Sequence, residues 1–267
     1  MLKIQALLYV TFIFLSFSGA HPATISIKNN CPYKIWPASL TAVNKPQLAL
    51  TGFELASGAS SSVDTPVPWT GRFWARTNCK TISSGKFTCG GDTWGSGPYW
   101  NEVLAPSLFT CDSPGDCASG QVACNGNGGN PPVTIVEFNI AGGGGQDFYD
   151  VSLVDGFNLP VSVTPQGGNG DCGNASCTAN LNANCPSELQ VKKGDGSVVG
   201  CKSACIAFNE SKYCCTPPNE TPETCPPTNY SKMFSQQCPD AYSYAYDDLT
   251  GTFTCSGSPD YTITFCP

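Results

Sequence analysis

Seventeen cysteines in 267 residues constrain this chain more than any other feature. Thiols at this density persist as disulfides, which form in oxidising compartments such as the extracellular space. Residues 1–20 combine Lys3, an apolar run over 6–17 and a final Ser18-Gly19-Ala20, an order typical of a cleaved signal peptide. The apolar run is shorter than the roughly 20 residues that a membrane-spanning helix needs. We therefore expect a secreted, disulfide-linked extracellular protein with no membrane anchor.

Composition and residue patterning favour a mainly β fold. Twenty-eight glycines and twenty-two prolines interrupt the chain, and no long stretch keeps helical periodicity. Without the leader, we expect one domain over 21–267 with a disulfide-rich region at about 167–238, where 203–208 is the one convincing short helix. Alternation of apolar and polar residues predicts strands over 24–28, 71–77, 133–140, 148–154, 161–164 and 261–266.

Charge and the scarcity of histidine exclude several function classes. The net charge is -7 and the 13 basic residues form no basic run, so we expect no nucleic-acid partner. His21 is the only histidine and lies at the start of the mature chain, which excludes catalysis by a serine or cysteine paired with histidine and leaves no histidine-based metal site. We expect no metal and no cofactor. Carboxylates remain as the acid and base candidates.

Several separate motifs resemble one known family. They are Asn29-Asn30-Cys31-Pro32-Tyr33, Gly71 to Thr77, Gly115-Asp116-Cys117, Gln146 to Asp150, Asp155-Gly156-Phe157-Asn158, Tyr213-Cys214-Cys215 and Cys238 to Tyr244. In this order, over about 23–267, the chain resembles the plant pathogenesis-related thaumatin-like proteins, most of all the fruit and pollen members. The resemblance implies a thaumatin-like β-sandwich with disulfide-rich loop domains, and we expect a monomer.

The resemblance also implies eight disulfides, which spacing alone does not define. The implied pairs are Cys31 with Cys266, Cys79 with Cys111 or Cys89, Cys117 with Cys124, Cys172 with Cys255, Cys177 with Cys238, Cys185 with Cys201, Cys205 with Cys214, and Cys215 with Cys225.

One cysteine is left over, because eight bridges use sixteen. Phe-Thr-Cys occurs at 87–89 and again at 109–111, and removal of 90–111 restores an even count and a nearly regular family pattern. We interpret 90–111 as an insertion. The alternatives are an ordinary surface loop, or a sugar-stacking platform formed by Trp94 and Trp100.

Five acidic and basic positions are candidate site residues. Alternation places Glu137 on the less apolar face of its strand, Asp150 lies in an apolar strand, and Asp155 follows in a turn. The resemblance groups these three with Arg72 and with one of Asp247 and Asp248 around an acidic cleft. We assign Glu137 and Asp155 as the catalytic candidates, and Arg72, Asp150, Asp247 and Asp248 as substrate-binding.

The cleft and the resemblance together suggest a defence protein of the apoplast that binds β-1,3-glucan of fungal cell walls and has antifungal activity. Crowded carboxylates raise one another's pKa and allow weak endo-β-1,3-glucanase activity, although binding alone is an alternative. Two further alternatives are an inhibitor of microbial hydrolases and an inert, disulfide-rigid protein known mainly as an allergen. Three sequons, at Asn174, Asn209 and Asn229, are expected glycosylation sites.

Overall fold

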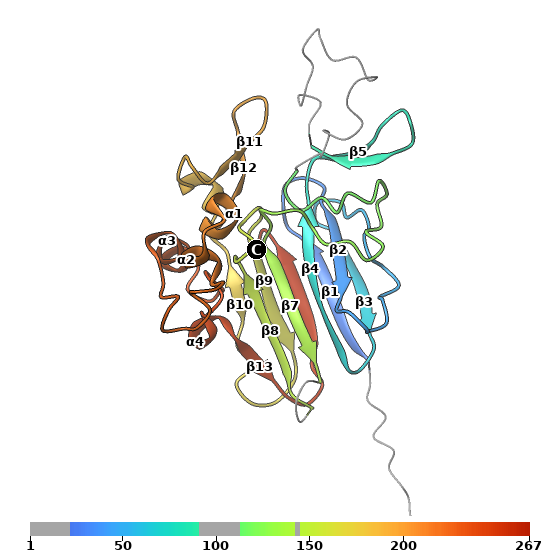
Figure 1. Ribbon diagram of the computed structural model, residues 1–267. Helices are drawn as coiled ribbons and strands as arrows, with labels where there is room; N and C mark the ends of the chain where they lie inside the picture. Colours follow the sequence, from blue (N-terminus) through green and yellow to red (C-terminus); the bar gives the residue numbers. More distant parts are fainter. Residues whose placement is uncertain (1–21, 91–112, 142–144) are drawn as a thin grey trace, which may run out of the picture.

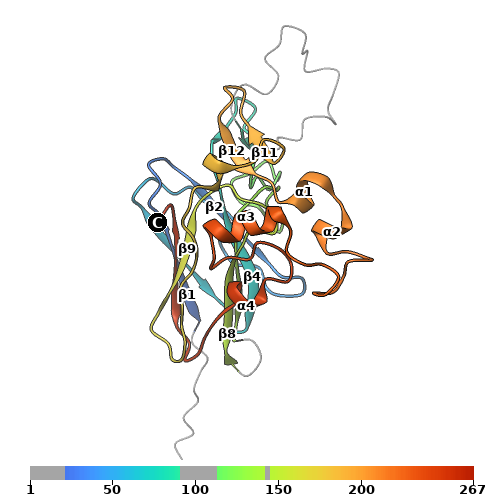
Figure 2. The ribbon, with the colours of Figure 1, turned by 90° about the vertical axis from the view of Figure 1, so that its left-hand side faces the viewer.

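The computed structural model describes residues 22–90, 113–141 and 145–267. Two five-stranded sheets face each other, and short helices gather at one side of them (Figure 1). In the view turned by 90°, β1 (Ala23–Asn29) and β9 (Val161–Gln166) of one sheet lie to the left of β4 (Trp69–Arg76) and β8 (Asp147–Ser152) of the other (Figure 2). The expected signal peptide, His21, Trp94 and Trp100 lie outside the described residues.

The first sheet contains the strands nearest to both ends of the chain. β1 runs parallel to β14, with Ile25 opposite Tyr261, and the Cys31–Cys266 disulfide closes the pair. The Cys31–Cys266 pair implied by the resemblance is thus present, and it joins the first and last strands within one sheet. Its strand order is β10 (Ala175–Cys177), β9 (Val161–Gln166), β14 (Asp260–Phe265), β1 (Ala23–Asn29) and β3 (Ser60–Thr65).

The second sheet is antiparallel throughout and carries the three strands that matter most for function. β4, β7 and β8 occupy its centre, flanked by one edge strand on each side. Its order is β13 (Phe253–Cys255), β8 (Asp147–Ser152), β7 (Ile135–Ile140), β4 (Trp69–Arg76) and β2 (Trp36–Thr41). All six strands expected from alternation are present, with bounds that differ by a few residues.

The main hydrophobic core lies between the two sheets. Val136, Phe138 and Ile140 of β7 are buried there, as the alternation of that strand predicts. Across the core, the ring of Tyr261 in β14 lies 5.0 Å from Phe138 and 5.1 Å from Tyr149 of β8. Aromatic pairs at these distances add to the free energy gained from burial. The core therefore locks the position of the strands that carry the candidate site.

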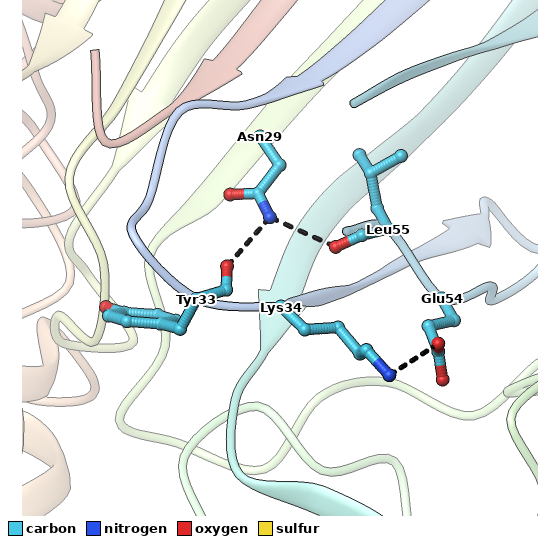
Figure 3. A network of polar contacts seen from close by, with 5 residues as sticks. All are labelled: Asn29, Tyr33, Lys34, Glu54 and Leu55. Carbon is cyan, nitrogen blue, oxygen red and sulfur yellow. Dashed lines mark hydrogen bonds and ion pairs between the residues drawn. The ribbon is translucent and has the colours of Figure 1, made fainter. Parts of the chain in front are cut away.

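The family motif beginning at Asn29 has a clear structural role. Asn29 is fully buried, and its side-chain amide donates to the carbonyl oxygens of Tyr33 (2.9 Å) and Leu55 (3.0 Å), as Figure 3 shows. Its side-chain oxygen accepts from the backbone of Cys31 at 2.9 Å. The exposed Lys34–Glu54 ion pair, 2.6 Å long, lies beside this network. One asparagine thus satisfies three backbone groups where the chain leaves β1.

Eight disulfides link the described residues, and seven of them have the pairing implied by the resemblance without an alternative. The eighth joins Cys79 to Cys89 across the ribbon of β5 (Cys79–Thr81) and β6 (Phe87–Cys89). Of the two partners left open for Cys79, the structure shows Cys89, and the alternative with Cys111 is wrong. Cys79 and Cys89 are directly opposite each other in a two-stranded ribbon, which brings them within bonding range. Cys111 lies outside the described residues.

The disulfide-rich region holds more helix than the sequence predicts. The expected helix is present as α1 (Ala204–Phe208), and Ser203 caps it by accepting from the backbone of Ile206. We did not predict α3 (Asn229–Gln237), although Thr228 and Ser231 form a capping box and Tyr230, Met233 and Phe234 recur at helical spacing. The other elements are η2 (Leu181–Asn184), β11 (Gln190–Lys192), β12 (Val198–Cys201), α2 (Ser211–Cys214), α3 (Asn229–Gln237) and α4 (Asp248–Gly251).

Candidate functional site

Three of the candidate residues form one row across the second sheet. Arg72 on β4 lies directly opposite Glu137 on β7, which lies directly opposite Asp150 on β8. Directly opposite residues have Cβ atoms roughly 5 Å apart. All three side chains point to the face away from the main core, because their strand neighbours Phe73, Phe138 and Tyr149 point into it.

An open groove extends to both sides of this row. On one side a hollow of about 700 Å³ is lined by the next row of the sheet, Thr70, Asn139 and Phe148, and by the loop of residues 42–47. On the other side a hollow of about 420 Å³ is lined by Ser152 and Asp155 among others. Arg72, Glu137 and Asp150 line both hollows. The row therefore forms the floor between two halves of a continuous groove.

The groove ends where a loop covers the same face of the sheet. Trp74 follows Arg72 on that face but is buried under residues 113–130, and its indole nitrogen donates to the carbonyl of Gly115 at 2.7 Å. A Cβ atom at Gly129 would lie 2.6 Å from the same indole nitrogen, so only glycine permits this approach. Packing of the loop on Trp74 leaves Arg72 open to the groove.

Asp155 enters the site from the turn after β8. Gly156 has φ of +90°, and a Cβ atom there would lie 2.6 Å from both the carbonyl oxygen of Cys201 and the side chain of Pro132. Glycine is therefore required for the tight turn that presents Asp155. The Arg72 guanidinium lies 3.9 Å from the Asp155 carboxylate, and both side chains are more than one-third exposed. Solvent screening makes this pair a weak contributor to stability.

The segment before α4 closes the site beside β8. Tyr242 pairs with β8 through backbone hydrogen bonds with Val151 and Leu153. Its phenol donates to Asp248 at 2.8 Å and also contacts the Thr252 hydroxyl. Tyr242 lines both halves of the groove, and we did not name it as a site residue from the sequence.

Asp247 and Asp248 differ in their surroundings. Both carboxylate oxygens of Asp247 accept hydrogen bonds from its own turn: Oδ2 from the backbone and hydroxyl of Ser243, and Oδ1 from the Thr250 hydroxyl. Asp248 is exposed, and its charge acts on Asp150. Of the two, Asp248 is thus electrostatically part of the row, whereas Asp247 holds the turn.

Burial raises the pKa of every carboxyl on the groove floor. For Glu137, the Arg72 guanidinium opposes the rise in pKa and the Asp155 charge adds to it. For Asp155, burial raises the pKa and Arg72 again opposes the rise. For Asp150, burial and the charges of Glu137 and Asp248 raise the pKa to about 8. The floor can therefore hold protons at pH values where ordinary carboxyls are ionised.

The sequons differ in accessibility. Asn174, Asn209 and Asn229 are exposed, and they remain predicted glycosylation sites. Asn219-Glu220-Thr221 is a fourth Asn-x-Ser/Thr sequence, and there the Asn219 amide nitrogen donates to the Thr224 carbonyl at 2.7 Å while its amide oxygen accepts from the Ser211 hydroxyl.

No helix within residues 22–90, 113–141 and 145–267 is long and apolar enough to cross a membrane.

Comparison with known proteins decides the family. The Thaumatin family model matches residues 29–267. The chain belongs to the thaumatin family. It is 63% identical over 267 residues to a Prunus avium protein named glucan endo-1,3-beta-glucosidase, with 100% of both chains covered. It is 61% identical over 265 residues to thaumatin-like protein 1a of Malus domestica, covering 99% of this chain and 98% of the relative.

Two more distant comparisons agree with the family and the fold. Pathogenesis-related protein 5 of Arabidopsis thaliana is 47% identical over 268 residues, with 100% of both chains covered. The structure of a laminaripentaose-producing beta-1,3-glucanase in complex with laminaritetraose matches with a TM-score of 0.56 at 12% identity, covering 92% of this chain and 99% of that chain. At this identity the likeness concerns the fold alone.

Proposed function

We propose that this protein is a secreted plant defence protein that binds β-1,3-glucan of fungal cell walls in its groove and has weak endo-β-1,3-glucanase activity. The observation that carries the proposal is the row of Arg72, Glu137 and Asp150 along the floor of one open groove. Carboxylates accept hydrogen bonds from sugar hydroxyls, and the aromatic residues Phe148 and Tyr242 line the same groove, as is common in ligand-binding sites. A groove that is open at both halves suits an extended polymer.

Secretion is supported by the eight disulfides, because such bonds persist in oxidising compartments. The proposed substrate is supported by the name of the Prunus avium relative, which is 63% identical over its full length. The disulfides and the name of this relative together favour the apoplast as the place where the protein contacts fungal cell walls.

Hydrolysis of a glycosidic bond needs two carboxyl groups in different protonation states. The protonated group donates its proton to the glycosidic oxygen as the bond to C1 breaks, and the ionised group attacks C1 or activates a water. Glu137 and Asp155 are the proposed pair. Burial raises the pKa of both carboxyls, and the positive charge of Arg72 lowers both pKa values and so limits the rise.

The test compares retention on insoluble β-1,3-glucan with release of reducing sugar. Glu137→Gln keeps the size and hydrogen-bonding capacity of the side chain but cannot ionise or act as an acid. We expect it to abolish sugar release and to keep most of the retention. The matched control is Glu223→Gln, which makes the same change at an exposed position away from the groove.

Replacement of both Glu137 and Asp155 by alanine should lower retention itself. A folded double variant that retains and releases glucan like the unmodified protein would remove the groove from the function. Retention without release in the unmodified protein would restrict the function to binding.

A further inference from the structure

Asp150 stands out within the groove floor because no cation among residues 22–90, 113–141 and 145–267 faces it. Its Oδ1 atom is buried and has no hydrogen-bond partner among the described residues. The titratable groups that face it are Glu137 from β7, Tyr242 from the segment before α4, and Asp248 from α4. Each of these is an acid. Within the described parts of the chain, no cation or hydrogen-bond donor stabilises a negative charge on this carboxyl.

The guanidinium of Arg72 favours the ionised forms of Glu137 and Asp155. Arg72 lies on β4, with β7 between it and Asp150. Its charge acts on Glu137 and on Asp155, whose carboxylate lies 3.9 Å away. If Glu137 and Asp150 were both ionised, Arg72 would offset the negative charge of Glu137, and the charge of Asp150 would have no positive charge to offset it. Uptake of a proton is how a buried carboxyl in this position avoids an unpaired charge.

We propose that Asp150 is uncharged when the groove functions, and that it donates its carboxyl hydrogen to the Glu137 carboxylate. Glu137 then has the positive charge of Arg72 on one side and the Asp150 carboxyl as a donor on the other. This arrangement fixes the orientation of Glu137 and favours its ionised form. Asp150 is therefore a positioning residue that acts through Glu137. The effect of this positioning on glucan binding rests on the function proposed above.

The ionisation order agrees with this assignment. The Glu137 charge is among the causes that raise the pKa of Asp150 to about 8, after burial. Glu137 has the Arg72 guanidinium to favour its ionised form, and Asp150 has none. As the pH rises, Glu137 therefore loses its proton first, and Asp150 keeps its own through neutral pH.

The first experiment measures ionisation directly and does not depend on glucan. Protein with 13C-labelled aspartate carboxyls is titrated by NMR from pH 3 to 9. We expect one carboxyl to titrate with a midpoint near 8, to be absent in Asp150→Asn, and to move to lower pH in Glu137→Gln, which removes the neighbouring charge. Titration of every aspartate below about pH 6 would overturn the proposal.

The second experiment tests the positioning role by retention on insoluble β-1,3-glucan from pH 5 to 9. The amide of Asp150→Asn can donate to Glu137 but cannot ionise, whereas Asp150→Ala can do neither. At pH 6 we expect retention to fall about tenfold in Asp150→Ala and clearly less in Asp150→Asn. Above pH 8 the unmodified protein should lose retention, while Asp150→Asn should keep its pH 6 value.

Two results of the second experiment would overturn the positioning role. One is a loss at alkaline pH in Asp150→Asn with the same midpoint as the unmodified protein. The other is equal weakness of the two variants at pH 6. If the unmodified protein is not retained at any pH, the proposed function fails, and the NMR titration then decides the ionisation of Asp150 by itself.

Discussion

Arg72 and Arg76 lie on the same face of β4, four residues apart, yet Arg72 opens onto the groove and Arg76 is fully buried. The Arg76 guanidinium donates to the carbonyl oxygens of Val122 (2.7 Å) and Trp36 (3.1 Å) and lies 5.2 Å from the ring centre of Phe87. Arg76 thus ties the loop closed by Cys117–Cys124 and the β5–β6 ribbon to the second sheet. Burial lowers its pKa to about 10, so it stays charged at neutral pH.

Arg76→Met is expected to destabilise the protein, because the buried carbonyl of Trp36 and the partly buried carbonyl of Val122 would lose their donor. The expected loss is about 2 to 4 kcal/mol, since hydrogen bonds to charged groups are among the strong ones. Chemical denaturation measures it. Arg72→Met is the control on the same strand and should change stability by less than about 1 kcal/mol, because its ion pair is solvent-screened. Equal losses in the two variants would contradict the difference in burial.

Arg72→Met should instead change the pH dependence of glucan retention. Arg72 lowers the pKa of Glu137 and of Asp155, so its removal lets both pKa values rise. On acidification the variant should lose retention at a higher pH than the unmodified protein. Arg72→Lys keeps a positive charge and should lie between the two. An unchanged midpoint in Arg72→Met would show that the guanidinium does not act on the groove carboxyls.

Asp150→Asn is expected to change how stability depends on pH. In the folded protein burial and neighbouring charges raise the pKa of Asp150 from 3.8 to about 8, so folding favours the protonated form. That contribution is complete below pH 3.8 and is lost as the pH rises through about 8. Relative to Asp150→Asn, the unmodified protein should therefore lose stability between these values, by a few kcal/mol at about 1.4 kcal/mol per pKa unit. Parallel curves of unfolding free energy against pH would contradict this.

A variant without residues 90–111 should be secreted and should melt at least as high as the full chain. The backbone nitrogen of Cys89 lies 3.5 Å from the side chain of Asp116, so residues 112–115 can connect directly to Cys89. Long insertions add loop-closure entropy, and an odd thiol invites mispairing. Cys111→Ser in the full chain separates the effect of the thiol from that of the loop. Misfolding of the shortened chain alone would show that the segment belongs to the fold.

Alkylation of the unreduced protein should label one cysteine, and peptide mapping should place the label at Cys111. The other sixteen are paired in the eight disulfides. Two or more labelled positions by mass spectrometry would contradict the pairing. Reduction should lower the melting temperature sharply, because each bridge commonly contributes about 2 to 4 kcal/mol.

Strands were predictable where alternation is regular, and edge strands were not. β2 contains Pro37 and β3 begins with three serines, compositions that give no clear strand pattern. Both strands lie at the edge of a sheet, where a proline that cannot donate and side chains that stay polar are tolerated. β2 and β3 form because they pair with β4 and β1, and the residues of each strand alone do not predict that pairing.

The sequence by itself determined the family, the number of disulfides and, among the candidate side chains, the outward direction of Glu137, because these depend on cysteine count, ordered motifs and a side-chain period of two. Only the tertiary structure decided which other segments pack against the candidate side chains. It buried Arg76 and opened Arg72 on one strand face, chose Cys89 for Cys79, and directed Asp247 to its own turn. A period of two defines the side of a sheet to which a residue points, whereas the segment that covers that side arrives from elsewhere in the chain.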